Sequence, residues 1–352
     1  MYKLSIIAVL AFALSVCGAV VFLFLAQKIG LVDEPGGRKV HKQLTPLIGG
    51  IIIFLGCMAI PAITTDIISW KIIVLMSITL GVGLLDDIFE ISAYLRLAIQ
   101  LFIGLGMSLS LSHPLITLGD FMGLGSVALG VFSIPIICFS VAAAKNALNM
   151  VDGIDGLAGV LALIPVAAMF FLASQGGVEN LAAISIALSI SIIVFLCLNF
   201  PLHNRPSALC FLGDSGSTLL GFMISYLLIS SAIAGLIKPV VALYLFAIPL
   251  TDSFCVFASR IKRRVSVVHP SRDHWHHLLI AGGLSNQQAT LFIGSIAIII
   301  AVAGLIMNHR DVSESIMFYL FIGFICVNAA GFSLSSKLVK LLVKEGRNIY
   351  FR

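Results

Sequence analysis

Residues 4–26 read LSIIAVLAFALSVCGAVVFLFLA, an apolar run that contains no charged side chain. A helix needs about 20 consecutive apolar residues to cross the hydrocarbon core of a bilayer, and this stretch is long enough. It follows one basic residue, Lys3, is too long for a signal-peptide core, and has no small-x-small cleavage site before a polar segment. We therefore expect a first membrane helix here.

The rest of the chain has the same character. Of its 352 residues, 60% are hydrophobic and only 11% are charged. Soluble globular domains are about half apolar and a quarter charged, so this composition excludes that class. It also excludes a disordered chain and a collagen. A disulfide scaffold is excluded as well, since the seven cysteines lack paired spacing and mostly lie in apolar runs. The prediction is one polytopic domain over residues 1–352.

Apolar stretches bounded by polar or turn residues predict an all-α integral membrane protein with about eleven transmembrane helices. The predicted spans are 4–26, 47–63, 67–85, 97–111, 122–144, 157–173, 181–198, 217–234, 240–258, 289–307 and 316–334.

Alternate connections between these spans lie on one side of the membrane. One set comprises residues 27–46, 86–96, 145–156, 199–216, 259–288 and the tail from 335, and it contains 17 of the 21 Lys and Arg residues. The positive-inside rule therefore predicts that this set is cytoplasmic, with the N-terminus outside and the C-terminus in the cytoplasm.

Ten of the 16 acidic residues lie in the same connections, and all the acidic clusters are among them. Carboxylates hold Mg²⁺, whereas Lys and Arg hold phosphate oxygens. The inner helix ends are therefore predicted to form one face that handles a metal and phosphates.

Asp86 and Asp87 end the third span, and Glu90 follows one helical turn later. A solvated helix end is the simple alternative. However, the helix dipole disfavours acids at a C-terminus, and adjacent carboxylates repel each other. We expect a cation to compensate them, which favours a role in binding metal or phosphate.

The segment from Asn146 to Gly156 carries two amides, Asn146 and Asn149, and two acids, Asp152 and Asp155. Acids spaced i and i+3 share a helix face, and the glycines between them let the backbone approach a ligand. An ordinary capped turn is the alternative. The density of polar groups favours a binding site.

Residues 211–217 read FLGDSGS at the start of the eighth span. The free N–H groups of a helix N-terminus bind anions, and Asp214 beside them is suited to a cation that bridges to the same phosphate. Gly-Asp-Ser-Gly also surrounds the nucleophile of trypsin-like proteases, but those are soluble all-β proteins.

The longest inner loop contains His274, Trp275, His276 and His277 after five basic residues, among them Arg260. Three histidines so close along the chain do not easily reach one tetrahedral ion, so phosphate binding is favoured over zinc. An unstructured basic loop is the other alternative.

The first inner loop, residues 33–46, adds a second basic segment. It carries Asp33, Arg38 and Lys42 and leads into Gly49-Gly50. Alone it is weak evidence, but beside the other motifs it is a candidate phosphate-binding arm.

These motifs, in this order, resemble the polyprenyl-phosphate N-acetylhexosamine-1-phosphate transferases, and most of all their bacterial WecA branch. The resemblance covers essentially the whole chain, from the GLVDEP of residues 30–35 to the HWHH of residues 274–277. It implies that undecaprenyl phosphate attacks the β-phosphate of UDP-GlcNAc, which gives GlcNAc-diphospho-undecaprenol and UMP. This would be the initiating step of an envelope glycan of the O-antigen or enterobacterial common antigen type.

The resemblance also implies residue roles. Asp214 and Asp87 would bind Mg²⁺, or Mn²⁺ in its place. Reaction roles fall on Asp86, Asp87, Asp152, Asp155 and His274. Substrate-binding roles fall on Asp33, Arg38, Lys42, Glu90, Asn146, Asn149, Asn199, Arg260, His276 and His277. The expected partners are undecaprenyl phosphate, UDP-GlcNAc and membrane lipid, with a homodimer left open and no nucleic acid.

Three positions depart from the branch: Glu90 stands where Asp is frequent, Trp275 where Ile is common, and Ser271 where an acid is usual, with Asp273 displaced. The same chemistry on UDP-MurNAc-pentapeptide is the near alternative. A secondary transporter is the alternative from another class. Transporters, however, place acids near the bilayer midplane on broken helices, whereas these acids lie at helix ends.

Overall fold

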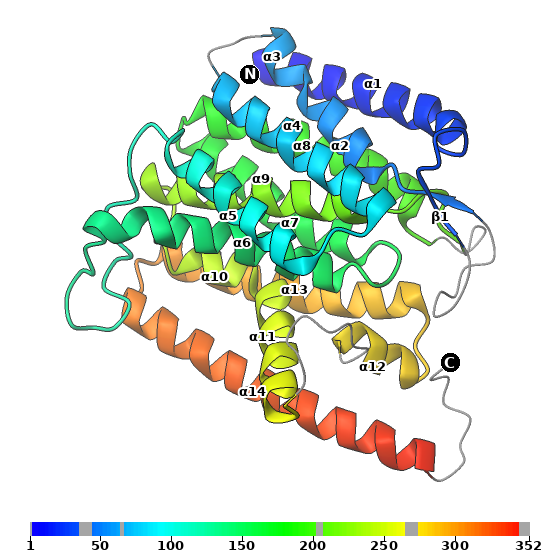
Figure 1. The fold of residues 1–352 in the computed structure, drawn as a ribbon. Helices are drawn as coiled ribbons and strands as arrows, with labels where there is room; N and C mark the ends of the chain where they lie inside the picture. Colours follow the sequence, from blue (N-terminus) through cyan, green and yellow to red (C-terminus); the bar gives the residue numbers. More distant parts are fainter. Residues whose placement is uncertain (1, 35–43, 64–66, 202–206, 265–273, 345–352) are drawn as a thin grey trace.

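The computed structural model describes residues 2–34, 44–63, 67–201, 207–264 and 274–344, with side chains through residue 335. The described chain is almost entirely helical (Figure 1). The first half contains α1 (Tyr2–Leu25), β1 (Val32–Asp33), β2 (Thr45–Pro46), α2 (Gly49–Cys57), α3 (Ala59–Ile63), α4 (Trp70–Phe89), α5 (Ala93–Ser108), the 3-10 turn η1 (Gly130–Phe132) and α6 (Ser133–Val151). The second half contains α7 (Leu157–Gln175), α8 (Glu179–Asn199), α9 (Gly213–Ile233), α10 (Val241–Leu245), α11 (Ala247–Lys262), α12 (Trp275–Ala281), α13 (Asn286–His309) and α14 (Glu314–Lys344).

Eight helical segments of the described chain are long and apolar enough to cross a membrane. They are α1, α4, η1 with α6, α7, α8, α9, α13 and residues 314–335 of α14. The segments Gly49–Ile63 and Ala93–Ser108 are apolar but shorter. The prediction of an all-α, multi-pass membrane protein is confirmed, while the count of eleven spans and the side of each terminus stay predictions.

Several predicted spans differ from the helices. The span at 47–63 is divided into α2 and α3 at Met58. The span at 122–144 is wrong at its start, because the helix begins only at Gly130. Gly119, Gly123 and Gly125 have φ of +76°, +78° and +104°, backbone conformations that interrupt a helix. The span at 240–258 is divided into α10 and α11 at Phe246. In Figure 1, α11 lies across the direction of the neighbouring long helices.

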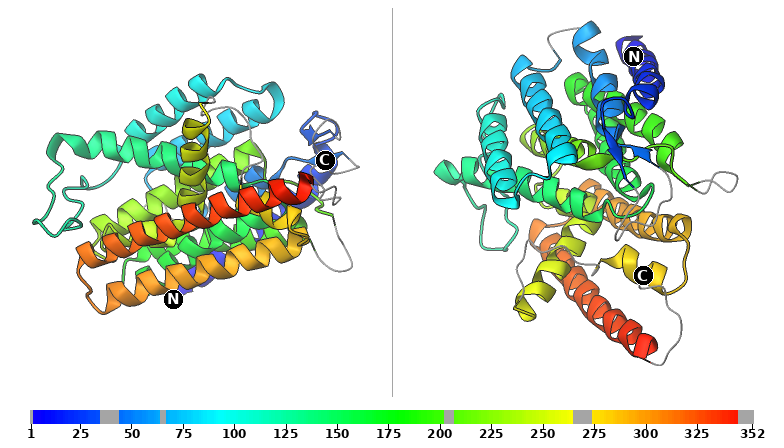
Figure 2. Two further views of the ribbon diagram at one scale, coloured as in Figure 1. Left: turned by 90° about the horizontal axis from the view of Figure 1, so that it is seen from below. Right: turned by 45° about the vertical axis from the view of Figure 1, so that its right-hand side comes forward.

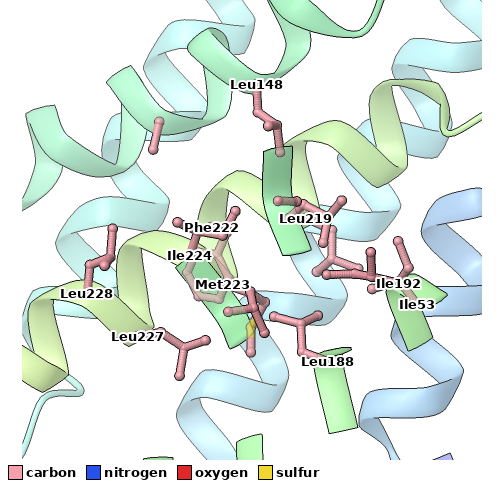
Figure 3. Packing of buried hydrophobic residues seen from close by; sticks show 14 of the residues in the cluster. Ile53, Leu148, Leu188, Ile192, Leu219, Phe222, Met223, Ile224, Leu227 and Leu228 are labelled. Atoms are coloured by element: carbon pink, nitrogen blue, oxygen red, sulfur yellow. The ribbon is translucent and has the colours of Figure 1, made fainter. Parts of the chain in front are cut away.

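Helix α9 lies at the centre of the apolar core and packs against α2, α4, α6 and α7. Its Phe222 and Met223 are fully buried, and Figure 3 shows Met223 near Leu188 of α8. Gly221 lets α9 approach α6 closely, since a Cβ there would lie 2.6 Å from the Lys145 Cα. This close packing places the N-terminal end of α9 against α4 and α6.

A short ribbon connects the first loop to the same end of the molecule. Strands β1 and β2 pair antiparallel, with Asp33 opposite Thr45. Beyond β2, the Phe211 N–H donates to the Pro46 carbonyl (2.8 Å), and the Gly49 N–H donates to the Phe211 carbonyl (3.0 Å). The ribbon, the end of α1 and the start of α13 therefore lie at the end of the molecule where α9 begins (Figures 1 and 2).

Candidate active site

Asp86 is a buried carboxylate whose charge is compensated by Arg96. The Arg96 Nη1 donates to Asp86 Oδ2 (2.7 Å), and the Ile91 N–H donates to Asp86 Oδ1 (2.8 Å). The chain reverses between them at Glu90, which has a left-handed φ of +50° and an exposed side chain. The compensating cation expected from the sequence is thus a side chain of α5. Arg96 belongs to none of the sequence motifs, although it is the single basic residue of the 86–96 connection.

Asp87 joins the end of α4 to the start of α9. Its Oδ1 accepts from the Asp214 N–H (2.6 Å), and its Oδ2 accepts from the Ser215 N–H (3.2 Å). A Cβ at Gly213, which has φ +74°, would lie 2.8 Å from Asp87 Oδ2, so the position requires glycine. The anion at this helix N-terminus is therefore a protein carboxylate, whereas the sequence predicted that the free N–H groups bind a substrate phosphate.

Asp214 receives contacts from two other helices. The Asn149 Nδ2 of α6 donates to Asp214 Oδ1 and also to Ser217 Oγ (3.0 Å). The Arg96 Nη1 lies 3.6 Å from Asp214 Oδ2. The side chain of Asp214 remains about one third exposed. A partly exposed carboxylate held by fixed donors is suited to contact an incoming ligand.

The two predicted amides of α6 have different surroundings. Asn146 exchanges hydrogen bonds with Gln100 of α5, the shorter from Asn146 Nδ2 to Gln100 Oε1 (2.6 Å). It therefore supports α5, and Asn149 contacts the acidic cluster directly. Asn146 and Asn149 therefore lie close together in α6 but have different roles.

Asp152 lies in the turn between α6 and α7, beside the other acids. Burial raises the pKa of its carboxyl well above the usual range, and the negative charges of Asp214, Asp155 and Asp87 raise this pKa further. No described residue donates a hydrogen bond to the Asp152 carboxylate. Acids held this close favour a cation among them.

Asn199, a predicted substrate ligand, is buried and supports this turn. Its Oδ1 accepts from the Gly156 N–H (2.7 Å), and its Nδ2 donates to the Cys210 carbonyl (2.9 Å). The amide thus ties the 152–156 turn to the segment that precedes α9. This geometry indicates a positioning role.

The histidine motif begins α12 and is held by Asp252 of α11. His274 Nδ1 and Asp252 Oδ2 are 2.7 Å apart, and both side chains are buried. The Trp275 N–H donates to Asp252 Oδ1 (3.0 Å), and Trp275 Nε1 donates to Asn328 Oδ1 of α14 (2.7 Å). The sequence left Asp252 without a role, although an acid inside an apolar helix is a strong functional signal.

His276 brings this motif against the acidic turn. A Cβ on Gly153 would lie 2.2 Å from His276 Nε2, so the ring lies directly over the backbone between Asp152 and Asp155. Burial lowers the pKa of His276 well below the usual range, and the neighbouring His277 and His274 lower it further. The ring is therefore neutral, and the rings of His274 and His276 stack with centroids 5.3 Å apart.

The remaining predicted residues lie around this centre or outside the described chain. Arg260 is buried in α11, two turns after Asp252, and Asp33 is partly exposed in β1. His277 is partly buried, with its ring centroid 4.2 Å from that of His276. Arg38, Lys42 and Asp273 lie outside the described residues.

The acidic side chains of this centre can be compared with the ligands that a metal ion requires. Among the described residues, no group of three or more His, Cys, Asp or Glu side chains is arranged to hold a metal ion. Mg²⁺ is usually bound by only one or two carboxylates together with substrate phosphates. The partly exposed Asp214, with Asp87 and Asp152 nearby, fits that mode better than it fits an all-protein cage.

Known proteins resemble this chain over most of its length. The glycosyl transferase family 4 model matches residues 69–232, which include the acids from Asp86 to Asp214. An undecaprenyl-phosphate alpha-N-acetylglucosaminyl 1-phosphate transferase of Yersinia pestis is 37% identical over 310 residues, covering 86% of this chain and 85% of the relative. The proteins of that name from Escherichia coli K12 and Haemophilus influenzae are 35% and 37% identical, covering 86% and 84% of this chain and 84% of each relative.

Proposed function

The chain belongs to glycosyl transferase family 4, and on that premise we propose that it transfers GlcNAc-1-phosphate from UDP-GlcNAc to undecaprenyl phosphate. The observation that carries the proposal is the convergence of Asp86, Asp87 and Asp214 with Arg96 at one end of α4, α5 and α9. The names of the relatives favour UDP-GlcNAc over UDP-MurNAc-pentapeptide.

In this reaction, an oxygen of the lipid phosphate attacks the β-phosphorus of UDP-GlcNAc. A bond forms between that oxygen and the β-phosphorus, the bond to the bridging oxygen of the diphosphate breaks, and UMP leaves with that oxygen. The lipid then carries GlcNAc on a diphosphate. Such transfers require mainly positioning and charge stabilisation from the protein.

The acceptor needs little help to become a nucleophile. A phosphate monoester has a second pKa of about 6, so it is largely ionised at neutral pH. Asp86 and Asp87 are held by Arg96 and by the start of α9, so we infer that they fix the geometry of the centre and take up any remaining proton. Mg²⁺, when bound at Asp214, would neutralise charge on the diphosphate.

The nucleotide would lie on the other side of the centre, beside the contact between the 152–155 turn and α12. Hydrogen bonding to Asp252 orients the His274 ring, so that Nε2 on the opposite edge remains for a contact with the substrate. Neutral His276 would contribute shape and a single hydrogen bond. The basic residues of the first and longest inner loops would add charge.

We place the reaction at the cytoplasmic face of a bacterial inner membrane, because the connections around the centre are the basic ones. The product would begin a lipid-linked envelope glycan of the O-antigen or enterobacterial common antigen type. A homodimer stays a prediction.

The test measures transfer of radiolabelled sugar phosphate from UDP-GlcNAc into butanol-extractable lipid by purified protein supplied with undecaprenyl phosphate and Mg²⁺. We expect labelled lipid and an equal amount of UMP, with loss of both on adding a chelator. Absence of transfer from UDP-GlcNAc by folded protein would overturn the proposal. Transfer from UDP-MurNAc-pentapeptide alone would keep the chemistry but change the sugar.

A further inference from the structure

Lys145 is a buried lysine that has no role in the proposed chemistry. It lies in α6, one turn before Asn149, and its residue is only 2% exposed. No described residue gives it a hydrogen bond or an ion pair. Burying an ammonium group without a hydrogen-bond partner is unfavourable. A lysine at such a place therefore indicates that a ligand supplies the missing acceptor.

A small cavity lies at this lysine, enclosed by four helices. Its walls include Thr79, Asp86, Arg96, Gln100, Lys145 and Thr218, and its size is about that of one water molecule. The Oγ1 of Thr79 is also buried without a hydrogen-bond partner. Two independent polar groups without partners therefore line the same space.

The charges around the cavity favour an anion. Asp86 is already paired with Arg96 and also accepts from the Ile91 N–H. The pair is close to neutral and satisfies itself, so the Lys145 amine and the Thr79 hydroxyl are left as donors for an incoming acceptor. A phosphate oxygen has the size and the charge to accept from both Lys145 and Thr79.

The place of the cavity indicates which phosphate. Its lining residues Val82, Arg96 and Ile99 are partly exposed, and around them Leu85, Leu95 and Phe102 present exposed apolar side chains on α4 and α5. Exposed apolar side chains on membrane helices favour contact with lipid, so we infer that the cavity opens near the lipid. The 152–155 turn follows the end of α6, about two helical turns beyond Lys145, and the histidine motif of α12 packs on that turn.

We propose that Lys145 and Thr79 bind one oxygen of the acceptor's phosphate, so that the cavity holds the lipid phosphate against the Asp86–Arg96 pair. The inference rests on the proposed function. It makes Lys145 a substrate-binding residue for the lipid and leaves the UDP-sugar to other groups.

The experiment compares Lys145→Met and Thr79→Val with the wild type, and Lys71→Met is the matched control because Lys71 is exposed at the start of α4. KM is measured for each substrate in turn, undecaprenyl phosphate and UDP-GlcNAc. Loss of a charge-assisted hydrogen bond corresponds to about a 10- to 100-fold change in binding. We expect KM for undecaprenyl phosphate to rise by that factor for Lys145→Met and by less for Thr79→Val, with KM for UDP-GlcNAc unchanged.

A second measurement separates binding from folding. Without substrates, Lys145→Met should be at least as heat-stable as the wild type, because an unpaired buried charge is removed. Undecaprenyl phosphate should raise the Tm of the wild type and of Lys71→Met but not that of Lys145→Met. UDP-GlcNAc should raise all three.

Other outcomes contradict the inference. An unchanged KM for undecaprenyl phosphate in both variants, or a rise confined to UDP-GlcNAc, would overturn it. If Lys145→Met fails to fold, an unchanged KM for undecaprenyl phosphate in Thr79→Val is enough to overturn the inference. Failure of the wild type to transfer any sugar phosphate would instead refute the proposed function, and the Tm shift with undecaprenyl phosphate would still test Lys145.

Discussion

The carboxylate of Asp87, in the last turn of α4, accepts a 2.6 Å hydrogen bond from the backbone N–H of Asp214, the second residue of α9. One acid thereby fixes the backbone that carries the other. The contact uses the positive end of the α9 dipole to stabilise a charge placed unfavourably at the end of α4. It explains how two acidic motifs so distant along the chain form one centre.

Asp87→Asn is expected to lower both stability and activity. The amide can accept only through its single oxygen, so one N–H of α9 loses its partner and the dipole loses its anion. Losses of this kind cost about 1–2 kcal/mol in helix-capping series. The midpoint of thermal unfolding in detergent checks this, and an unchanged midpoint would contradict it.

Asp214→Asn is expected to separate activity from folding. Asp214 is partly exposed, and its backbone N–H still donates to Asp87 in the variant. Transfer should fall to background while the unfolding midpoint stays close to that of the wild type. Turnover that persists at saturating Mg²⁺ would remove Asp214 from the metal site.

Arg96→Gln is expected to destabilise the protein through Asp86. The variant leaves a buried carboxylate with only the Ile91 N–H as donor. The cost should be about 1–3 kcal/mol, less than for a fully buried pair because the Arg96 side chain is 27% exposed. The double variant with Asp86→Asn should recover part of this loss, and strictly additive effects would show that the two residues are not coupled.

Asp252→Asn is expected to act on the nucleotide side alone. Without the carboxylate, His274 Nδ1 and the Trp275 N–H lose their charged hydrogen-bond partner, and the His274 ring is held less firmly. KM for UDP-GlcNAc should rise about tenfold, while KM for undecaprenyl phosphate stays constant. A loss of folded protein with neither KM changed would indicate a structural role only.

Stability should also depend on pH through His276. Its pKa is lowered in the folded protein, so the unfolded state binds a proton more readily. This contribution is complete above the unfolded pKa of about 6.5 and is lost as the pH falls towards the lowered folded pKa. Between pH 8 and pH 5, the wild-type unfolding midpoint should therefore fall more than that of His276→Gln. Parallel curves would contradict the assignment.

Much of this molecule could be predicted from local sequence. Apolar runs locate the membrane helices because lipid requires about 20 apolar residues per crossing, whatever the neighbours. The ends of these helices are less determined. Residues 122–129 are as apolar as a helix start, yet they form turns and bends at positive-φ glycines, and the helix begins only at Gly130. The motifs that supply Asp86, Asp152, Asp214 and His274 were each visible as polar groups in an apolar chain.

Composition and local spacing are enough to show that the chain lies in a membrane and which short segments carry its chemistry. The partners of these segments depend on the packing of the whole chain: Asp87 pairs with a helix start 127 positions away, Arg96 with Asp86, and Asp252 with His274. High hydropathy makes each helix compatible with lipid but does not encode which helices adjoin. That choice comes from the close packing of α9 against α4 and α6 at small residues such as Gly83 and Gly221.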